Sequence, residues 1–363
     1  MTEAFARIPI ALPVDPMLCK SVPGIPQPDA PGDLLYEPKW DGFRCLVIRD
    51  GDDVALDSRG AKPLTRYFPE VVDAVRRLLP ERVVADAEIV VRAGTPGQQH
   101  LAWDALTQRI HPAASRVARL AAETPAELVL FDLLALGDDD LMGRPFRDRR
   151  ATLEAATAHL TDADPIHVTR NTDDPALAET WFEHFEGAGL DGVVAKPADA
   201  PYAPGKRTMF KIKHARTCEA VAWGYRVHTS GNGVGSILFG LYTDDGDLRP
   251  VGGASAFSNA VRLELIDLLA PLLQLDADGA PVRWAGERSR FTAAGKDMST
   301  YLLEPELVAE LRFDQLEGDR FRHNAQFVRW RPDRTPASCL LSQIDRPLAY
   351  DLDDVLGRST NGT

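Results

Sequence analysis

The sequence predicts an α+β protein of two domains, in which a domain of mixed antiparallel sheets with helices is followed by a small β-barrel. Three observations support this prediction. The chain has 363 residues, 44% of them hydrophobic and 26% charged, which is typical of a globular protein with a large core. Short β-rich runs dominate up to Lys213, with helical spacing between them but no regular βαβ alternation. The later part of the chain reads as strands with one helix.

The elements of the first domain follow from local patterns. Residues 1–33 are rich in proline and glycine and predict an extended arm packed on the domain. Apolar residues at helical spacing predict helices over 68–79 and 175–188. Apolar, β-rich runs predict strands over 34–36, 43–49, 54–57, 83–91, 128–136, 193–196 and 209–213.

The second domain has the element order and size of a small barrel such as an OB-fold. Residues 219–257 read as hairpin strands, because Gly, Asn and Asp mark turns at 230–233 and 244–247. One helix is predicted over 259–272, followed by strands over 308–315 and 326–330. These patterns predict domains over 1–215 and 216–340 and a tail over 341–363.

The composition limits the classes of function. A formal net charge of −13 argues against a uniformly basic surface for nucleic acid, but the charge is uneven. Residues 206–216 and 320–334 each hold five lysines or arginines. Each segment could bind phosphates or could be a solvated basic face. The chain has no apolar stretch long enough for a membrane span and no signal-peptide pattern, and its four cysteines are scattered. We therefore expect a cytoplasmic protein that does not bind a membrane.

One lysine, Lys39, has the surroundings of a nucleophile. It lies in the run Glu37-Pro38-Lys39-Trp40-Asp41-Gly42-Phe43-Arg44, in a chain with only eight lysines among 41 basic residues. A lysine amine attacks only when neutral, and its ordinary pKa of about 10.4 keeps it protonated unless burial or nearby cations lower the pKa. Lys196, Lys211 and Lys213 fall on predicted strands, where they suit phosphate oxygens and would repel the charge of Lys39.

Other residues in this part of the chain could bind a nucleotide, although each also has a structural interpretation. Glu88 ends a strand-like run and Asp191 begins another, and such carboxylates could hold Mg²⁺ between substrate phosphates, but Asp-Gly is also a common turn pair. Phe131 could stack on a nucleobase or fill the core. Arg44 and Arg59 could grip phosphates, although Arg59 also reads as a surface arginine. The usual glycine-rich phosphate loops are absent.

The ordered set of motifs resembles the covalent nucleotidyltransferases, which are the DNA ligases, RNA ligases and mRNA capping enzymes. The amino-acid sequence around Lys39, Pro145 and Trp330 looks like that of the bacterial ATP-dependent DNA ligases of the actinobacterial ligase C type. This chain departs from the common pattern with Asp191 for Glu, Ala87 for Gly and Arg334 for Lys. The set runs Lys39-x-Asp41-Gly42-x-Arg44, Ser58-Arg59, Asp86-x-Glu88, Phe131-Asp132-x-Leu134, Asp191-Gly192-x-x-x-Lys196, Lys211-x-Lys213 and Arg331-x-Asp333-Arg334.

The resemblance implies a nucleotidyltransferase (adenylation) domain followed by an OB-fold, and an ATP-dependent DNA ligase. Such an enzyme joins a 5′-phosphate to a 3′-hydroxyl at a nick, through a covalent lysyl-AMP and a DNA-adenylate, with ATP and Mg²⁺ or Mn²⁺. The catalytic residues would be Lys39, Asp41 and Arg44, and the metal ligands Glu88 and Asp191. The implied nucleotide-binding residues are Glu37, Lys39, Arg44, Arg59, Glu88, Phe131, Lys196, Lys211, Lys213, Arg331 and Asp333.

The resemblance also implies the partners of the chain. They are nicked double-stranded DNA and end-joining or gap-repair proteins such as Ku and a polymerase/primase, with the chain acting as a monomer in DNA repair. We expect no separate helical DNA-binding domain before the first domain, so DNA affinity should rest on phosphate contacts and depend strongly on salt. The barrel is expected to close on the first domain for the first step and to reopen for DNA.

Two alternatives remain open at this point. Capping enzymes and RNA ligases share the lysine and the barrel. The close match to the sequence motifs of the bacterial ligases disfavours a guanylyltransferase. A protein of another class, a nucleic-acid-binding protein that keeps the barrel without catalysis, would not need Lys39, Lys211 and Lys213 together. Labelling the protein with ATP or GTP separates these alternatives.

Overall fold

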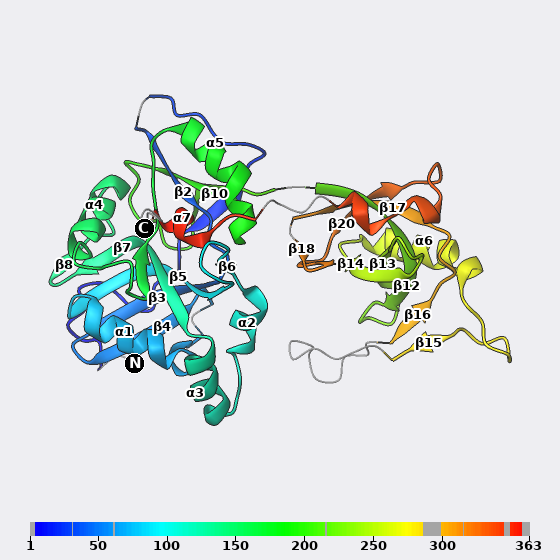
Figure 1. Ribbon diagram of the computed structural model, residues 1–363, viewed down its shortest axis with the longest axis horizontal. Helices are drawn as coiled ribbons and strands as arrows, with labels where there is room; N and C mark the ends of the chain where they lie inside the picture. The colour runs from blue at the N-terminus through cyan, green and yellow to red at the C-terminus, as the bar shows by residue number, and fades with distance from the viewer. Residues whose placement is uncertain are drawn as a thin grey trace. The chain divides into compact units, whose positions relative to one another are not determined.

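The computed structural model describes residues 4–30, 32–60, 62–214, 216–285, 299–314, 316–344 and 349–357. It divides into two compact units, unit 1 with residues 1–213 and 347–363 and unit 2 with residues 214–346 (Figure 1). The predicted boundary after residue 215 lies two residues beyond this division. The predicted α+β class with mixed antiparallel sheets is confirmed.

Unit 1 contains a seven-stranded sheet. The path β4-β3-β5-β7-β8 is antiparallel throughout, with β6 beside β5 and β9 parallel to β7. Its central strands alternate β-branched and other apolar residues that are buried on both faces, which explains their prediction from composition. The strands are β3 (Phe43–Asp50), β4 (Asp53–Ser58), β5 (Arg82–Ala93), β6 (His100–Leu101), β7 (Ala126–Leu136), β8 (Asp139–Asp140) and β9 (Ile166–Val168).

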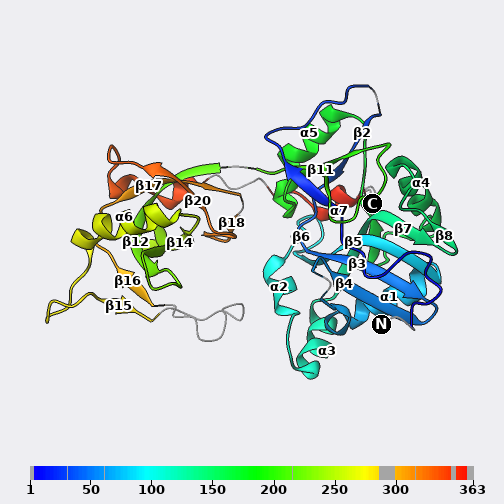
Figure 2. The ribbon, with the colours of Figure 1, turned by 180° about the vertical axis from the view of Figure 1, so that it is seen from behind.

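A second, four-stranded sheet completes the framework of unit 1, and Figure 2 labels two of its strands, β2 and β11. Its order is β1-β11-β10-β2, with β1 (Leu18–Ser21) parallel to β11 (Arg207–Ile212). β10 (Val193–Pro197) is antiparallel to β11 and to β2 (Leu34–Pro38). The predicted N-terminal arm thus contributes one strand, and the pairing of β2 with β10 brings the residues after β2 next to those before β10.

Helices cover both sheets of unit 1. α1 (Pro69–Leu78) begins with a proline at its first position and buries Val71, Val72 and Val75 against the seven-stranded sheet. α5 (Pro175–His184) packs Ala178 and Trp181 on the four-stranded sheet. The other helices are α2 (Trp103–Gln108), α3 (Ala114–Glu123), α4 (Phe146–Ala156), and the short 3₁₀ helices η1 (Thr65–Tyr67) and η2 (Phe185–Ala188).

The C-terminal segment, predicted as a tail over 341–363, carries secondary structure where the structure describes it. Residues 349–357 pack on unit 1, where α7 (Leu352–Leu356) buries Leu352 and Val355 in the cluster that also holds α5 (Figure 1). Arg92 holds Asp353 at 2.6 Å. The sequence did not reveal α7, because a helix of five residues is too short to show a periodic pattern.

Within its described residues, unit 2 is a curled antiparallel sheet with one α-helix, which confirms the predicted OB-fold. β12 pairs with β13, β16 and β17, β13 pairs with β14, and β20 pairs with β17. A bridge between Ala254 and Ala325 brings the end of β14 to the segment before β20. The elements are β12 (Arg216–Val227), β13 (Val234–Tyr242), β14 (Leu248–Ala254), α6 (Asn259–Leu269), η3 (Ala270–Leu272), β15 (Arg283–Trp284), β16 (Thr300–Leu302), β17 (Val308–Phe313), β18 (Leu316–Glu317), β19 (Arg320–Phe321), β20 (Gln326–Trp330), η4 (Pro336–Ser338) and η5 (Leu341–Gln343).

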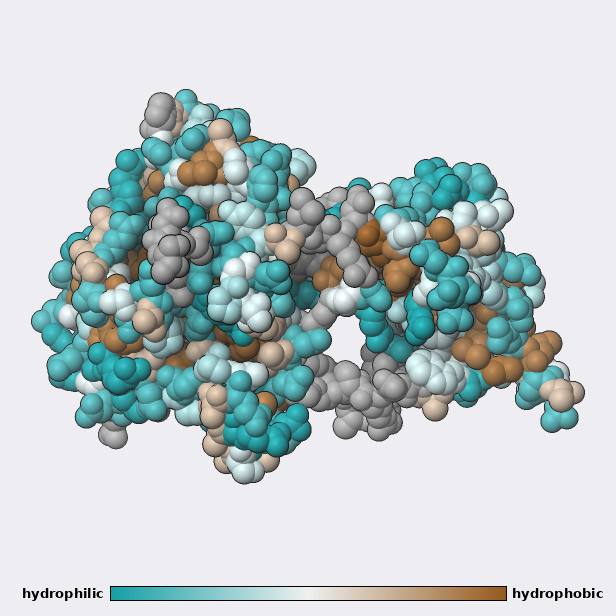
Figure 3. Space-filling view, in the orientation of Figure 1, coloured by the Kyte–Doolittle hydropathy of each residue, from teal (hydrophilic) through white to brown (hydrophobic). Residues whose placement is uncertain are grey.

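The surface is mostly hydrophilic on the face shown in Figure 3, with separate hydrophobic patches. Among the described residues, no helix has the length and apolar character that a membrane crossing needs.

Candidate active site

Lys39 lies in the loop that follows β2, and the backbone fixes this loop against the start of β10. The Lys39 N–H donates to the Gly192 carbonyl at 2.8 Å, and the Lys39 carbonyl accepts from the Asp191 N–H at 2.9 Å. The indole Nε1 of the buried Trp40 donates to Thr169 Oγ1 at 2.7 Å. The loop that carries Lys39 is therefore held on both sides of the lysine.

Two glycines in the motifs are required by close packing. A Cβ on Gly42 would clash with the Ile89 carbonyl oxygen, so only glycine lets the Lys39 loop approach β5. Gly192 has φ +121° and a Cβ there would meet the Ile212 carbonyl oxygen. The Asp-Gly pairs of the sequence are therefore not only turn signals, because their glycines let the Lys39 loop approach Glu88 of β5 and Asp191, which lies just before β10.

Asp191 bridges two of the predicted lysines. Its Oδ2 lies 2.5 Å from Lys39 Nζ and 2.8 Å from Lys213 Nζ. Burial alone would raise the pKa of the Asp191 carboxyl, but the two ammonium groups outweigh burial and lower it. Asp191 is therefore an anion already neutralised by two cations, which makes it a weaker metal ligand than the sequence suggests.

Lys211 belongs to the same cluster of cations. Burial and the like charges of Lys213 and Lys39 lower the pKa of the Lys211 ammonium. Lys39, Lys211 and Lys213 thus form a positively charged group at the ends of β2 and β11, with Asp191 as the carboxylate among them. Such a group suits the phosphates of a nucleotide.

Glu88 on β5 faces the other side of the Lys39 loop. Its Oε1 accepts the Gly42 N–H at 3.0 Å. Burial raises the pKa of Glu88 to about 7, although Lys39 and Arg44 oppose this rise. Ionisation of this carboxyl is costly because it is buried, so an added cation would stabilise its ionised form.

The carboxylates near Lys39 fit a magnesium ion only together with substrate. In the described part of the chain, no three His, Cys, Asp or Glu side chains gather as a metal site. Mg²⁺ commonly takes one or two carboxylates and completes its shell with substrate phosphates and water. Because Asp191 is already paired with two lysines, Glu88 is the better ligand of the predicted pair.

Glu37 and Lys196 form a separate buried ion pair. Glu37 Oε2 lies 2.6 Å from Lys196 Nζ, and Glu37 Oε1 lies 3.3 Å from Arg150 Nη1. Lys196 Nζ also donates to the Phe131 carbonyl at 2.9 Å and lies 4.9 Å from the centre of the Phe131 ring. Lys196 therefore supports the predicted aromatic platform, with its charge balanced by Glu37.

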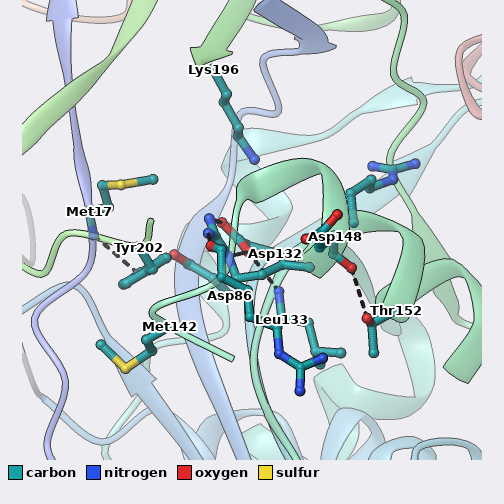
Figure 4. A network of polar contacts seen from close by, with 12 residues as sticks. Met17, Asp86, Asp132, Leu133, Met142, Asp148, Thr152, Lys196 and Tyr202 are labelled. Carbon is teal, nitrogen blue, oxygen red and sulfur yellow. Dashed lines mark hydrogen bonds and ion pairs between the residues drawn. The ribbon is translucent and has the colours of Figure 1, made fainter. Parts of the chain in front are cut away.

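Arg44 is held by a carboxylate that is itself held by a tyrosine. Arg44 Nε and Nη2 donate to the two oxygens of Asp86 at 3.0 and 2.6 Å. Tyr202 Oη donates to Asp86 Oδ2 at 2.7 Å and accepts the Met17 N–H at 3.1 Å, and Figure 4 shows Tyr202 between Met17 and Asp86. Asp86 is fully buried, so this chain of contacts fixes the direction of the Arg44 guanidinium.

Phe131 is half-buried on β7, and its ring lies 5.6 Å from the Arg44 guanidinium carbon. The next residue, Asp132, is buried and accepts two hydrogen bonds from Arg149 of α4 at 2.8 and 2.9 Å. Figure 4 shows Asp132 in the same network as Asp86 and Lys196. Phe131 is therefore placed by the groups around it rather than packed as an ordinary core residue.

The other predicted residues are Arg59, Asp41, Arg331 and Asp333. Arg59 is exposed in the turn after β4, and among the described residues it makes no recorded hydrogen bond or ion pair. Asp41 is half-buried in the Lys39 loop. Arg331 and Asp333 belong to unit 2, where Arg331 binds Asp333 at 2.8 Å and Glu219 at 2.6 Å. This ion pair lowers the pKa of Asp333 to about 2.

The sequence did not reveal the supporting residues. Tyr202, Arg149 and Arg150 hold Asp86, Asp132 and Glu37, but no local pattern distinguishes them from other tyrosines and arginines. Cys19 of β1 also lies within electrostatic reach of Arg44, Lys196, Lys39 and Lys211, while burial raises the pKa of its thiol. The parallel pairing of β1 with β11, which brings Cys19 there, joins segments too far apart in sequence for local patterns to detect.

Two family models match the chain. The model described as the ATP dependent DNA ligase domain matches residues 16–213, and the one described as the ATP dependent DNA ligase C terminal region matches residues 230–334. The first match spans most of unit 1, including Lys39, Glu88, Asp191 and Lys213. The second lies within unit 2.

Curated relatives and a solved structure agree with these matches. The chain is 53% identical over 364 residues to DNA ligase C of Mycobacterium tuberculosis, covering 96% of this chain and 99% of the relative. It is 51% identical over 356 residues to DNA ligase C1 of Mycolicibacterium smegmatis, with the same coverage. A structure from a study of Lig E DNA ligases shares the fold, with a TM-score of 0.53, 16% identity, and coverage of 88% of this chain and all of that chain. The chain therefore belongs to the ATP-dependent DNA ligases.

Proposed function

We propose that this chain seals nicks in double-stranded DNA through an AMP carried on Lys39. The observation that carries the proposal is the position of Lys39, whose Nζ lies 2.5 Å from Asp191, in a loop that also contacts Glu88 of β5. Lys211 and Lys213 add positive charge to the same place. This is the arrangement that an amine nucleophile and a triphosphate need.

In the first step, Lys39 Nζ attacks the α-phosphorus of ATP, the bond to the β-phosphate oxygen breaks, and pyrophosphate leaves. The ammonium must lose a proton before it attacks, and the Asp191 carboxylate is within hydrogen-bond distance to take it. Lys211 and Lys213 would hold the α-phosphate oxygens, and Phe131 would stack on the adenine. Arg331 and Asp333 would orient the pyrophosphate.

The second and third steps use the same site. A 5′-phosphate oxygen of the nicked strand attacks the α-phosphorus and Lys39 leaves, which gives the DNA-adenylate. The 3′-hydroxyl then attacks the 5′-phosphorus and AMP leaves. Arg44, which Asp86 directs, and Arg59 would bind the phosphate at the nick, and Asp41 would support the Lys39 loop and the nicked strand.

A divalent cation fits the site as described. Glu88 would be its first protein ligand and Asp191 the second once Lys213 turns to a phosphate. When bound, Mg²⁺ or Mn²⁺ would neutralise charge on the phosphates and on the leaving pyrophosphate.

The proposal extends to the setting of the reaction. The family favours a monomer that repairs DNA in the cytoplasm, beside end-joining or gap-repair proteins such as Ku and a polymerase/primase. Its substrate would be nicked duplex DNA.

The experiment is labelling with ATP or GTP that carries a label on the α-phosphate. We expect wild type with Mg²⁺ to take an acid-labile label from ATP and to pass it to nicked DNA, and Lys39→Ala to take none. Lys62→Ala, which removes an exposed lysine from the turn after β4, is the matched control and should label like wild type. Label on Lys39→Ala would move the nucleophile to another residue. Label from GTP alone would favour the capping branch.

A further inference from the structure

Lys39 and Phe131 belong to different sheets of unit 1. Lys39 follows β2 of the four-stranded sheet, and Phe131 lies on β7 of the seven-stranded sheet. In the proposed reaction, Lys39 attacks the α-phosphorus of a nucleotide whose base would stack on Phe131. The distance between the nucleophile and the base is therefore set by the contacts that join the two sheets.

Residues 169–172, which follow β9, form one such connection. The Thr169 N–H donates to the Leu130 carbonyl of β7 at 2.9 Å. Thr172 exchanges two backbone hydrogen bonds with Tyr36 of β2, at 2.8 and 3.0 Å. This segment therefore runs from β7 of one sheet to β2 of the other.

The side chain of Thr169 reaches the loop that carries Lys39. Thr169 Oγ1 accepts the indole N–H of Trp40 at 2.7 Å. Thr169 is fully buried and Trp40 is 5% exposed, so loss of the hydroxyl would leave a buried donor without its acceptor, which is costly. Thr169 thus contacts both the residue after Lys39 and, through its N–H, the residue before Phe131.

Arg150 of α4 holds the backbone of Thr169 from another side. Its Nη2 donates to the Thr169 carbonyl at 2.5 Å, and its Nη1 lies 3.3 Å from Glu37 Oε1. Glu37 in turn binds Lys196 at 2.6 Å, and Lys196 Nζ donates to the Phe131 carbonyl at 2.9 Å. The backbone around Thr169 is therefore held independently of its hydroxyl, so a change that removes only the hydroxyl releases only the loop after β2.

We propose that Thr169 is a positioning residue, whose hydroxyl sets the place of Lys39 Nζ relative to the α-phosphorus of a nucleotide stacked on Phe131. The inference deepens the proposed function and rests on Lys39 as the nucleophile. A displacement of about 1 Å between reacting groups can slow a reaction about 100-fold. The contacts that Phe131, Lys211 and Lys213 would make with the nucleotide do not involve the hydroxyl, so its loss should lower the rate and not the affinity.

The experiment measures the single-turnover rate at which the full chain takes label from ATP, over a range of ATP concentrations. We expect Thr169→Val to lower the maximal rate about 10- to 100-fold and to leave the half-saturating ATP concentration near that of wild type. Thr169→Ser keeps the hydroxyl and should restore most of the rate. Thr157→Val is the matched control, because it removes a buried hydroxyl that donates to the Leu153 carbonyl at 2.7 Å, at the end of α4, and it should label at the wild-type rate.

Two further measurements separate positioning from a general loss of structure. Trp40→Phe removes the same hydrogen bond from the other side, so it should slow labelling to a similar extent. The double variant should then be no slower than the slower single variant, because both changes break one interaction. Sealing of a nick that already carries AMP should stay near the wild-type rate in Thr169→Val, because Lys39 forms no bond in that step.

Several outcomes would overturn the inference. A wild-type maximal rate in Thr169→Val would do so, as would an equal loss of rate in Thr157→Val or in Thr169→Ser. A raised half-saturating ATP concentration at an unchanged maximal rate would make Thr169 a support for binding instead. Additive losses in the double variant, or equal slowing of the sealing of adenylated nicks, would also contradict it. A wild type that takes no label from ATP would contradict the proposed function, and this result is detected separately.

Discussion

At the scale of single residues, the site is a set of carboxylates with different partners. Asp191 has two ammonium groups within 2.8 Å, so it stays ionised. Asp86 is buried but is held by Arg44 and Tyr202. Glu88 has only the Gly42 N–H as a direct partner recorded among the described residues, and burial raises its pKa. The same side-chain chemistry therefore serves as counter-ion, as support and as candidate metal ligand.

The raised pKa of Glu88 predicts a dependence of stability on pH. The carboxyl binds its proton more tightly in the folded state, with a pKa of about 7 against the ordinary 4.5. Its contribution to stability is therefore complete below about pH 4.5 and is lost as the pH rises through 7. Without nucleotide or divalent cation, we expect the free energy of unfolding of wild type to fall relative to Glu88→Gln between pH 5 and 8, by up to about 3 kcal/mol.

Urea unfolding over this pH range measures the effect. Glu81→Gln, at an exposed glutamate next to β5, is the control and should track wild type. A constant difference between wild type and Glu88→Gln over the range would show that Glu88 keeps its ordinary affinity for the proton.

The hydroxyl of Tyr202 is predicted to stabilise unit 1. Tyr202→Phe leaves the buried Met17 N–H without its acceptor and Asp86 without one donor. We expect a loss of about 1–3 kcal/mol in the free energy of unfolding, because buried polar groups that lose a partner carry a desolvation cost. Tyr36→Phe, which loses a bond to the Pro26 carbonyl at 2.6 Å in a less enclosed place, should lose less. Equal losses in both variants, measured in urea, would argue against a special role for the buried network.

At the scale of elements, the least expected one is α7. It is only five residues long, yet Leu352 and Val355 are fully buried in the cluster beneath α5, and Asp351 accepts the Gln99 N–H at 2.9 Å. Arg170 Nη1 donates to the Asp354 carbonyl at 2.9 Å. Such a short helix would not be stable alone, so its structure depends on this docking.

Truncation of one side chain tests the docking of α7. Leu352→Ala should cost about 2–5 kcal/mol of the stability of unit 1, because the site is enclosed on all sides. Leu356→Ala, on the partly exposed side of the same helix, should cost clearly less. Thermal unfolding of both variants gives the comparison, and a loss for Leu352→Ala no larger than that for Leu356→Ala would show that α7 contributes little.

At the scale of the whole molecule, regular patterns in the sequence predicted the helices and strands, whereas elements without such a pattern were missed. Predicted and observed bounds agree closely for α1, where apolar residues repeat at the helical period, and for β5 and β20, which were predicted from runs of β-forming residues. α4 was missed because Arg149 and Arg150 occupy buried positions that the pattern reserves for apolar side chains. β1 was missed because its stabilising partner, β11, lies far along the chain.

The site was predictable where residues react or bind directly, and not where they support one another. Lys39, Asp191 and Lys213 stand out by type and spacing, and the structure brings them together. Their contacts follow from the pairing of β2 with β10, which the sequence did not specify. Tyr202 has no local signal, since its role arises from a fold that joins β1, β5 and the β10–β11 connection.

The return of the C-terminal residues to unit 1 changes how the molecule can be dissected. Unit 2 is an insertion, with unit 1 on either side of it in the sequence. Stopping translation after Lys213 would not release an intact catalytic fragment, because it would also delete Leu352 and Val355 and uncover the apolar surface beneath them. A clean excision would have to splice residue 213 to residue 347.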